Sequence, residues 1–293
     1  MVAISGPAQI AEVASLLRSS GSVFAEDEAR LLIAEAASPE LLSELVAKRM
    51  RGLPLELILG WAEFCGLRIV VEPGVFVPRR RTAFMVELAT QLAVAGDVVV
   101  DLCCGSGAVG AALSVAVPGI RLYAADVDPA AVRCARRNLP AHTVFEGDLF
   151  DALPQSLAAT IGILVANAPY VPTDAIGLMP PEARLHEAPV ALDGGADGLS
   201  VQRRVISDAA RWLAPGGVLL IETSEGQSPL TAEAFAAAGF ATAVHHCDEF
   251  DSTIVIGTLP RSSNPASSPF LMDAGGCDAS DRLPAIQLRS CAT

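Results

Sequence analysis

The 293-residue chain is poor in basic residues, with 20 Lys and Arg against 33 Asp and Glu, and its formal net charge is −13. Strong non-specific binding to a nucleic-acid backbone needs clustered positive charge, so this balance argues against it. No uninterrupted apolar run of about 18 residues occurs, and we therefore expect no membrane span. Residues 1–10 lack the basic and apolar regions of a secretory signal, which favours a cytoplasmic protein.

Closely spaced cysteine pairs are also missing. The seven cysteines are scattered, with no C-x-x-C pair. Zinc sites are usually built from such pairs, and an odd count in a chain of this length does not indicate a disulfide framework. We therefore expect no metal site and a reducing compartment. Apolar residues are plentiful instead: they make up 52% of the chain against 18% charged residues, which rules out wholesale disorder.

The chain changes character at three places, which predicts four parts. Apolar periodicity interrupted by Gly and Pro predicts short helices, and hence a small N-terminal helical domain at 1–60. Alternation of apolar and polar residues predicts a linker β-hairpin at 61–80, and a larger α/β domain follows at 81–260. The stretch 261–293 is rich in Ser, Pro and Gly without periodicity, so we expect it to be disordered.

Buried strands and helices alternate through the larger domain. This alternation predicts an α/β fold with a doubly wound, mostly parallel sheet and helices on both faces. The last two predicted strands have no helix between them, so they must form a hairpin and place one antiparallel strand in a seven-stranded sheet. Strands are predicted at 98–100, 121–125, 142–146, 161–166, 217–222, 242–247 and 253–259, and helices at 82–95, 107–117, 130–138, 199–213 and 229–238.

A glycine-rich loop, DLCCGSGAVG at residues 101–110, follows the first buried strand and precedes a helix. Glycine allows a ligand to approach the backbone closely, and the N-terminus of a helix offers unpaired N–H groups. The loop contains one G-x-G-x-x-G pattern, which alone is a weak signal. It leaves a nicotinamide-dependent oxidoreductase open as one interpretation.

Three aspartates at strand ends favour a different cofactor. Asp101 would repel a pyrophosphate but attract an ammonium group, and Asp126 could accept hydrogen bonds from both ribose hydroxyls of an adenosine. A nucleoside that carries an amino acid satisfies both, which predicts S-adenosyl-L-methionine. Asp148, at the end of the third strand, is placed where the adenine amino group would be. The alternatives are a loop-capping role for Asp101, a turn role for Asp126 and a capping role for Asp148.

The tetrapeptide NAPY at residues 167–170 directly follows the apolar strand predicted at 161–166. Taken with the cofactor loop, it makes the chain resemble the HemK/PrmC-type protein-(glutamine-N5) methyltransferases, among the wider amino-methyltransferases with an N/D-P-P-Y/F motif. The resemblance covers roughly residues 53–259. Further matching stretches are GLPL at 52–55, VPR at 77–79, EAP at 187–189, DGL at 197–199, LAPGG at 213–217 and LIE at 220–222.

The resemblance implies a Rossmann-like, S-adenosylmethionine-dependent methyltransferase. Its partner would be a peptide-chain release factor, methylated on the glutamine of a Gly-Gly-Gln loop. Three departures from the family pattern stand out. Ala168 stands where the family usually has a proline, and Cys103 occupies the first glycine position of the loop. The run RRTA at 80–83 stands where the family has a run that contains two acidic residues. The last change favours a divergent paralogue with altered substrate contacts.

The motif also suggests how a poor nucleophile is used. A carboxamide or aniline nitrogen has a delocalised lone pair. Two acceptors for its N–H bonds would hold it pyramidal and aim that lone pair at a methyl group. We predict that these acceptors are Asn167 Oδ1 and the backbone carbonyl of Ala168. Pro169 would restrict the backbone and Tyr170 would wall the target group. The alternative is a plain strand-to-loop turn closed by proline.

Several other residues have two interpretations. Glu222 is either a carboxylate beside the site or a strand-end cap, and Phe76 and Arg79 either line the substrate mouth or, for Phe76, pack in the core. The basic run 79–81 either attracts an acidic or RNA partner or forms a solvated surface.

Three other functions stay open on the sequence alone: an adenine-N6 or cytosine-N4 methyltransferase, a nicotinamide-dependent oxidoreductase, and a catalytically silent protein that binds the cofactor. The methyltransferase interpretation assigns two sets of residues. The predicted catalytic residues are Asn167, Ala168, Pro169 and Tyr170, and the predicted cofactor-binding residues are Asp101, Cys103, Cys104, Gly105, Ser106, Gly107, Asp126, Asp148, Leu149 and Asn167.

Overall fold

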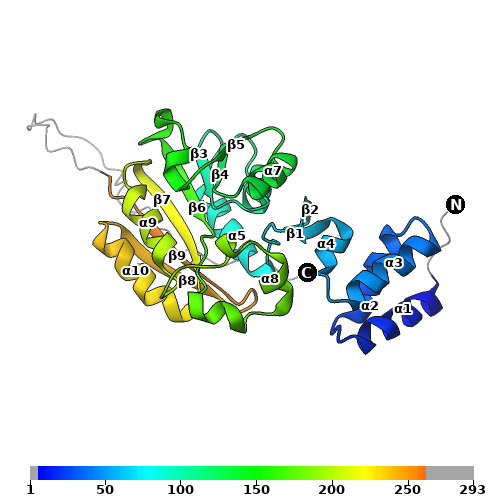
Figure 1. The fold of residues 1–293 in the computed structure, drawn as a ribbon. Helices are drawn as coiled ribbons and strands as arrows, with labels where there is room; N and C mark the ends of the chain where they lie inside the picture. Colours follow the sequence, from blue (N-terminus) through cyan, green and yellow to red (C-terminus); the bar gives the residue numbers. More distant parts are fainter. Residues whose placement is uncertain (1–5, 262–293) are drawn as a thin grey trace, which may run out of the picture. The chain divides into compact units, whose positions relative to one another are not determined.

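The computed structural model describes residues 6–261, which belong to one compact unit. Four helices come first, as the apolar periodicity predicts, and they enclose a hydrophobic core of their own that includes Leu17, Leu32 and Leu45 (Figure 1). The predicted domain boundaries at residues 60 and 80 stay a prediction. The four helices are α1 (Pro7–Ser19), α2 (Ala25–Glu35), α3 (Pro39–Met50) and the short α4 (Leu55–Leu59).

An antiparallel hairpin follows, made of β1 (Trp61–Phe64) and β2 (Leu67–Val70). Cys65 and Gly66 connect the two strands, and both have positive φ, at 50° and 74°. A two-residue turn of this kind matches the right-handed twist of the strands that it joins. The predicted strand pair is therefore present, and the chain runs on from it to residue 80 without a further strand.

The larger part of the described chain consists of alternating strands and helices, which confirms the predicted α/β fold. Its elements are α5 (Ala83–Leu92), β3 (Val98–Leu102), α6 (Ala108–Ala116), β4 (Arg121–Asp126), α7 (Pro129–Asn138), β5 (Thr143–Glu146), β6 (Ile161–Ala166), α8 (Pro181–His186), α9 (Ser200–Ala209), β7 (Leu213–Thr223), α10 (Ser228–Ala237), β8 (Ala241–Cys247) and β9 (Ser252–Thr258). Short 3₁₀ turns lie between them, at Arg80–Thr82, Leu149–Ala152, Gln155–Leu157, Thr173–Leu178, Pro189–Ala191 and Glu225–Gln227.

The sheet has seven strands in the order β5-β4-β3-β6-β7-β9-β8, and β9 alone runs antiparallel to its neighbours. Every residue of β3 is buried, as expected for a central parallel strand covered on both faces. The strand order reverses between β3 and β6, where the chain moves first toward one edge of the sheet and then toward the other. In open α/β sheets, ligands bind outside the carboxyl ends of the strands at such a switch point.

The main difference from the predicted elements lies between α9 and β7. A helix was predicted at 199–213, but α9 ends at Ala209 and β7 already begins at Leu213, which pairs with Ile161 of β6. Apolar residues at the end of a helix and at the start of a buried strand look alike in sequence, so periodicity placed Leu213 on the wrong side of the boundary. Among the described residues, no helix combines the length and apolarity needed to cross a bilayer. The tail predicted to be disordered lies outside the described residues, apart from Arg261.

Candidate functional site

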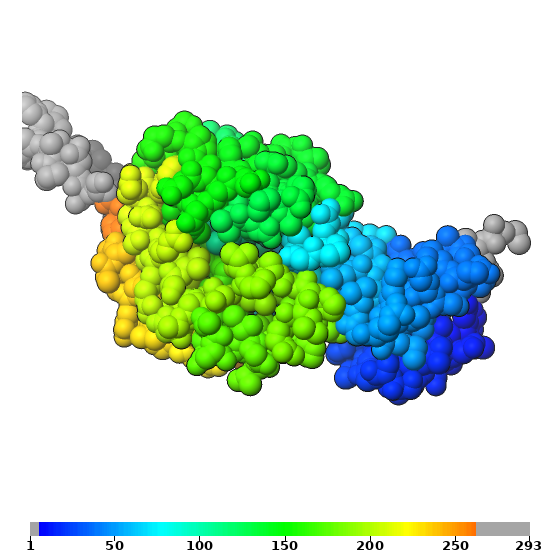
Figure 2. Space-filling model, viewed as in Figure 1, coloured from blue at the N-terminus to red at the C-terminus, as the bar shows by residue number. Residues whose placement is uncertain are grey.

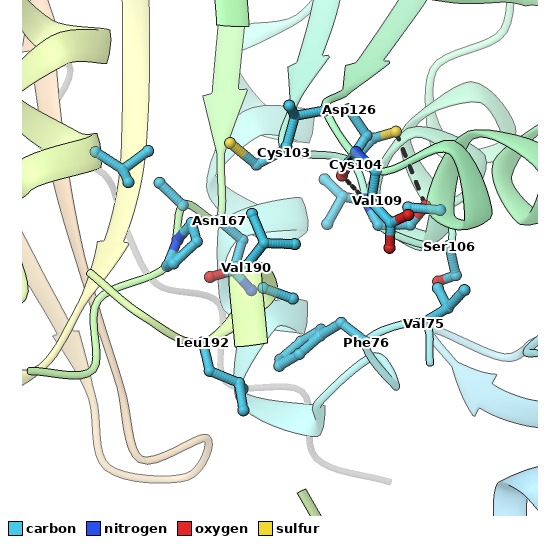
Figure 3. Close-up of a pocket in the computed structure, with 18 of the residues that line it drawn as sticks. Val75, Phe76, Cys103, Cys104, Ser106, Val109, Asp126, Asn167, Val190 and Leu192 are labelled. Carbon is cyan, nitrogen blue, oxygen red and sulfur yellow. Dashed lines mark hydrogen bonds between the residues drawn. The ribbon is translucent and has the colours of Figure 1, made fainter. Parts of the chain in front are cut away.

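A cavity of about 440 Å³ opens at the carboxyl ends of β3, β4 and β6, at the switch point of the sheet. The space-filling view shows the surface hollowed where the segments around residues 75, 140 and 190 meet (Figure 2). In the close-up, Asn167 and Val190 lie on one side of the cavity and Ser106 and Val109 on the other (Figure 3). The predicted residues that line it are Asp101, Cys103, Cys104, Gly105, Ser106, Asp126, Asp148, Leu149, Asn167, Ala168, Pro169 and Tyr170.

Gly107 is the one predicted residue that does not line the cavity. Its φ is 78°, and an added Cβ would lie 3.0 Å from the Leu139 side chain and 3.2 Å from Ala135 Cβ. The glycine therefore allows the start of α6 to pack against α7. It shapes the loop from the side that faces α7. Its contact with the cofactor stays a prediction, because Gly107 does not line the cavity.

The loop after β3 turns through left-handed backbone positions. Cys103 and Gly105 both have a φ of 55°. A residue with a side chain costs roughly 1–2 kcal/mol in that conformation, so Cys103 carries a strain that glycine would avoid. Burial raises the pKa of the Cys103 and Cys104 thiols, with nearby aspartates adding to the effect. Both side chains are therefore neutral thiols that fill space, and nothing activates them as nucleophiles.

Asp101 ends up buried beside the cavity, with 2% of its surface exposed. Its Oδ2 accepts a 3.0 Å hydrogen bond from the backbone N–H of Gly110. Burial raises the pKa of Asp101 to about 7, and the negative charge of Asp126 adds to that rise. A buried carboxylate with a single backbone partner gains strongly from a cation, which fits the ammonium group predicted to bind here.

Asp126 has the turn role that its sequence position allowed, and its role in binding the ribose hydroxyls stays a prediction. Its Oδ1 accepts from the backbone N–H of Asp128 at 2.9 Å, which is the turn role, and its Oδ2 accepts from Gly105 N–H at 2.8 Å. Each carboxylate oxygen keeps a lone pair after one such bond. Burial raises the pKa of Asp126 above its ordinary value. The residue therefore anchors the loop and still presents two acceptors to the cavity.

Asp148 lies at the rim, with 49% of its side chain exposed, and its Oδ2 pairs with Arg204 Nη2 at 2.7 Å. Leu149 beside it lines the cavity with a φ of 50°. Arg204, from α9, was not predicted to be near the site. The salt bridge leaves one carboxylate oxygen of Asp148 free to accept, so its predicted contact with an adenine amino group stays a prediction.

The residues 167–170 begin directly after β6 and form the opposite wall. Ala168 is fully buried, and Asn167 Nδ2 donates to Thr82 Oγ1 at 3.2 Å. The Tyr170 hydroxyl donates to Glu222 Oε1 at 3.2 Å, and its backbone carbonyl accepts from Gln227 Nε2 at 3.0 Å. Residue 167 therefore faces the cavity from a backbone segment that is fixed at both ends.

The segment before α5 closes the cavity between these two walls. Arg79 Nη2 donates to Glu187 Oε1 at 2.6 Å, and the same oxygen accepts from the backbone N–H of Val77 at 3.2 Å. The Arg79 guanidinium lies 4.7 Å from the centre of the Phe76 ring, in cation–π contact. Phe76 and Arg79 thus line the cavity, as one of their two interpretations proposed. The EAP stretch at 187–189 and the VPR stretch at 77–79 marked Glu187 and Arg79 separately, but nothing in the sequence indicated that the two residues pair.

Within residues 6–261, no group of three or more His, Cys, Asp and Glu is placed to hold a metal ion.

Sequence reasoning missed the site residues whose contacts join segments that are far apart in the chain. They include Thr82, Arg204 and Gln227, together with the apolar mouth residues Met179, Val190 and Leu192.

Comparisons with known proteins agree with this geometry. The family described as "Methyltransferase small domain" matches residues 66–195. A protein of Geobacter sulfurreducens named "Release factor glutamine methyltransferase" is 38% identical over 200 residues, which are 67% of this chain and 69% of that protein. A protein of Streptomyces pristinaespiralis named "4-amino-L-phenylalanine/4-methylamino-L-phenylalanine methyltransferase" is 38% identical over 205 residues, 66% of this chain and 69% of that protein.

Solved structures support the fold in the same way. A methyltransferase from Pyrococcus furiosus superposes with a TM-score of 0.51 and 17% identity, over 67% of this chain and 90% of that chain. At that identity the likeness concerns the fold alone. It agrees with the mostly parallel seven-stranded sheet described above.

Proposed function

The chain belongs to the family of release factor glutamine methyltransferases, and from this premise we propose that it methylates the side-chain nitrogen of a glutamine in the Gly-Gly-Gln loop of a peptide-chain release factor. It is an S-adenosyl-L-methionine-dependent methyltransferase. The cytoplasmic location is part of the proposal, because a release factor acts at the ribosome. So is the expectation that nucleic acid is not bound strongly, which the net charge of −13 supports.

The cavity suits this cofactor. Asp101 is a buried carboxylate without a salt bridge to any residue of the described range 6–261, and Asp126 presents acceptors at the end of the next strand. We propose that Asp101 holds the ammonium group, that Asp126 binds the ribose hydroxyls and that Leu149 packs on the adenine. Cys104, Gly105 and Ser106 would form the backbone that approaches the cofactor closely. When bound, S-adenosylmethionine supplies an electrophilic sulfonium methyl group.

One observation carries the proposal: Asn167 lines the same cavity as Asp101 and Asp126, although 41 residues separate Asn167 from the nearer of them (167 − 126). We propose that Asn167 Oδ1 and the Ala168 carbonyl accept the two N–H bonds of the substrate amide. With both N–H bonds held, the nitrogen becomes pyramidal and its lone pair faces into the cavity. Positioning of this kind is worth about 7–11 kcal/mol in favourable cases. No strong general base is needed, because methylation makes the nitrogen more acidic and it then releases its proton.

The alanine at position 168 is compatible with this role. The proposed acceptor is the backbone carbonyl, which alanine and proline share, and Pro169 still restricts the backbone that follows. Tyr170 would form the wall against which the planar amide packs. Its hydroxyl already donates to Glu222, so the ring is held in place before a substrate arrives.

The test is methyl transfer to a purified release factor, followed by mass spectrometry of its Gly-Gly-Gln peptide. We expect one added methyl group with the wild-type chain and at least a hundredfold lower rate with Asn167→Ala. A rate that Asn167→Ala leaves unchanged would reject the mechanism. Cofactor binding without transfer to any release factor would favour the catalytically silent protein instead. The comparisons do not favour the nucleic-acid or nicotinamide alternatives.

A second candidate substrate is an aromatic amine that carries a carboxylate. Of the arginines that line the cavity, Arg79 pairs with Glu187 and Arg204 with Asp148, whereas Arg81 makes no salt bridge within residues 6–261. An apolar mouth with one such cation suits a planar amine with an anionic end. The Streptomyces pristinaespiralis relative is named for a substrate of that kind. Parallel assays with release factor and 4-amino-L-phenylalanine separate the two candidates.

A further inference from the structure

The side chain of Asn167 is held from behind by a chain of polar groups. Its Nδ2 donates to Thr82 Oγ1 at 3.2 Å, and Thr82, at the start of α5, is 3% exposed. The Thr82 hydroxyl in turn lies beside the carboxylate of Glu222 near the end of β7. Burial raises the pKa of Glu222, and hydrogen bonding by Thr82 opposes that rise. These three residues come from three segments of the chain. We call them the Asn167 relay.

Glu222 is a buried carboxylate whose two oxygens differ in their hydrogen bonding. It is 2% exposed, and its Oε1 accepts a hydrogen bond from the Tyr170 hydroxyl. Its Oε2 is buried and has no hydrogen-bond partner among the described residues. An acceptor in this position costs free energy unless a donor turns toward it, and the Thr82 hydroxyl is the donor beside it.

The direction of the hydrogen bonds in the Asn167 relay follows from which of its groups carry a proton to donate. An ionised carboxylate only accepts, and a threonine hydroxyl has one proton to give. If Thr82 gives that proton to Glu222, its lone pairs remain for Asn167, which must then offer its NH₂ group. The amide oxygen of Asn167 is thereby turned to the other side. Because Asn167 lines the cavity, that side is where a substrate NH₂ group would need an acceptor.

The reverse arrangement shows why the carboxylate matters. A neutral group at position 222 that donated to Thr82 would make Thr82 donate toward Asn167. The amide would then flip and present its NH₂ group to the cavity, where it would repel a substrate NH₂. Burial raises the pKa of Glu222 on balance, and the hydrogen bonds from Thr82 and Tyr170 and the charge of Arg81 oppose that rise, so they favour the ionised form.

We infer that Thr82 and Glu222 are positioning residues, which fix the amide of Asn167 so that Oδ1 faces the NH₂ group that receives the methyl group. The inference rests on the role proposed above for Asn167. It adds Thr82, which lines the cavity, and Glu222 behind it, and it gives Glu222 a use that its sequence position left undecided. Tyr170 also donates a hydrogen bond to the Glu222 carboxylate, so the Asn167 relay links the Tyr170 wall of the cavity to the acceptor oxygen of Asn167.

A binding experiment tests the relay without a methyl acceptor. Sinefungin carries an amine where S-adenosylmethionine carries its methyl group, and S-adenosylhomocysteine carries nothing there. The ratio of their dissociation constants, measured by calorimetry on the full chain, therefore reports the acceptors at that point. We expect the wild type to prefer sinefungin, and Thr82→Val to lose about tenfold of that preference while its affinity for S-adenosylhomocysteine is unchanged.

Four further variants make the test specific. Thr82→Ser keeps the hydroxyl and should keep the preference. Glu222→Gln should lose the preference for sinefungin. The double variant that combines Thr82→Val with Glu222→Gln should lose no more of this preference than the more affected single variant, because both residues act through the same hydrogen-bonded path. Thr223→Val is the matched control. Thr223 is equally buried on the same strand, but its hydroxyl contacts only Thr231, at 3.4 Å, among the described side chains, so the preference should be unchanged.

The outcomes separate the relay from the proposed function. If Asn167→Ala abolishes the preference for sinefungin and Thr82→Val does not, the relay is wrong while the role of Asn167 stands. If Asn167→Ala leaves the preference intact, the role of Asn167 is wrong and the relay falls with it. If the variants behave as expected but the wild type does not methylate a release factor, the relay stands and the proposed substrate is rejected.

Discussion

The backbone N–H of Gly105 donates a 2.8 Å hydrogen bond to Asp126 Oδ2, which ties the glycine-rich loop after β3 to the end of β4. The other oxygen of Asp126 accepts from Asp128, so one side chain sets the path of two loops. The same carboxylate lines the cavity. Loop geometry and ligand binding therefore depend on a single residue, and a substitution should affect them to different degrees.

Asp126→Asn is expected to weaken cofactor binding more than it changes folding. One amide oxygen can still accept from Gly105, so the loop keeps its anchor, but one of the two acceptors for the ribose is replaced by a donor. Calorimetry with S-adenosylhomocysteine should show an affinity lower by about ten- to a hundredfold. Asp97→Asn is the control, because Asp97 accepts from the backbone N–H of Val94, away from the lining of the cavity. Equal losses in both variants would contradict the assignment.

Asp126 also shows what sequence can and cannot predict here. Parallel strands place their carboxyl ends along one edge, so Asp101, Asp126 and Asn167 were predictable as neighbours once β3, β4 and β6 were recognised. The presence of one antiparallel strand was predictable as well, because no helix separates the last two predicted strands. Partners such as Thr82 and Arg204 were not predictable, because their contacts depend on how helices and loops pack over that edge. Nothing in their local sequence marks those contacts.

Gly107 shows a second limit of prediction from sequence. Its place in the glycine-rich pattern predicted a contact with the cofactor, yet it faces Ala135 and Leu139 rather than the cavity. A glycine in such a loop serves either a ligand or the packing of a helix, and the pattern alone does not distinguish the two.

Asp101→Asn is expected to stabilise the ligand-free chain at pH 8 while weakening cofactor binding. Burial raises the pKa of Asp101 to about 7 in the folded state. A raised carboxyl pKa means that the folded state holds the proton more tightly than the unfolded state. Stability from this group is therefore present at low pH and lost as pH rises through about 7. Asparagine removes that loss and can still accept from Gly110, for a gain of about 2–4 kcal/mol at pH 8.

Thermal unfolding of the ligand-free wild type and Asp101→Asn at pH 5 and pH 8 measures this effect. The advantage of the variant should shrink between pH 8 and pH 5, since the wild-type carboxyl is protonated at the lower value. The affinity for S-adenosylhomocysteine, measured at pH 8, should fall in the variant because the ammonium group loses its counter-charge. A stability difference that is the same at both pH values would show that Asp101 does not titrate as its burial implies.

Ala168→Pro is expected to leave methyl transfer within about threefold of the wild-type rate. The proposed acceptor is a backbone carbonyl, which proline also has, so the substitution changes the ring and not the chemistry. The measurement is kcat on whichever substrate the wild type methylates, with thermal unfolding to confirm that the variant folds. A loss of tenfold or more, in a variant that unfolds like the wild type, would mean that the alanine methyl itself is needed for the shape of the site.

Arg81→Gln distinguishes the two candidate substrates through a cycle of four measurements. If Arg81 binds a substrate carboxylate, the wild type should prefer 4-amino-L-phenylalanine over its uncharged carboxamide by about tenfold in kcat/KM, and the variant should lose that preference. The cycle cancels any effect of Arg81 on Glu222, because that effect is common to both substrates. Arg80→Gln is the control, since Arg80 is exposed and lies 3.6 Å from Glu249 rather than in the cavity lining. An unchanged preference in Arg81→Gln would leave the release factor glutamine as the substrate that the cavity fits.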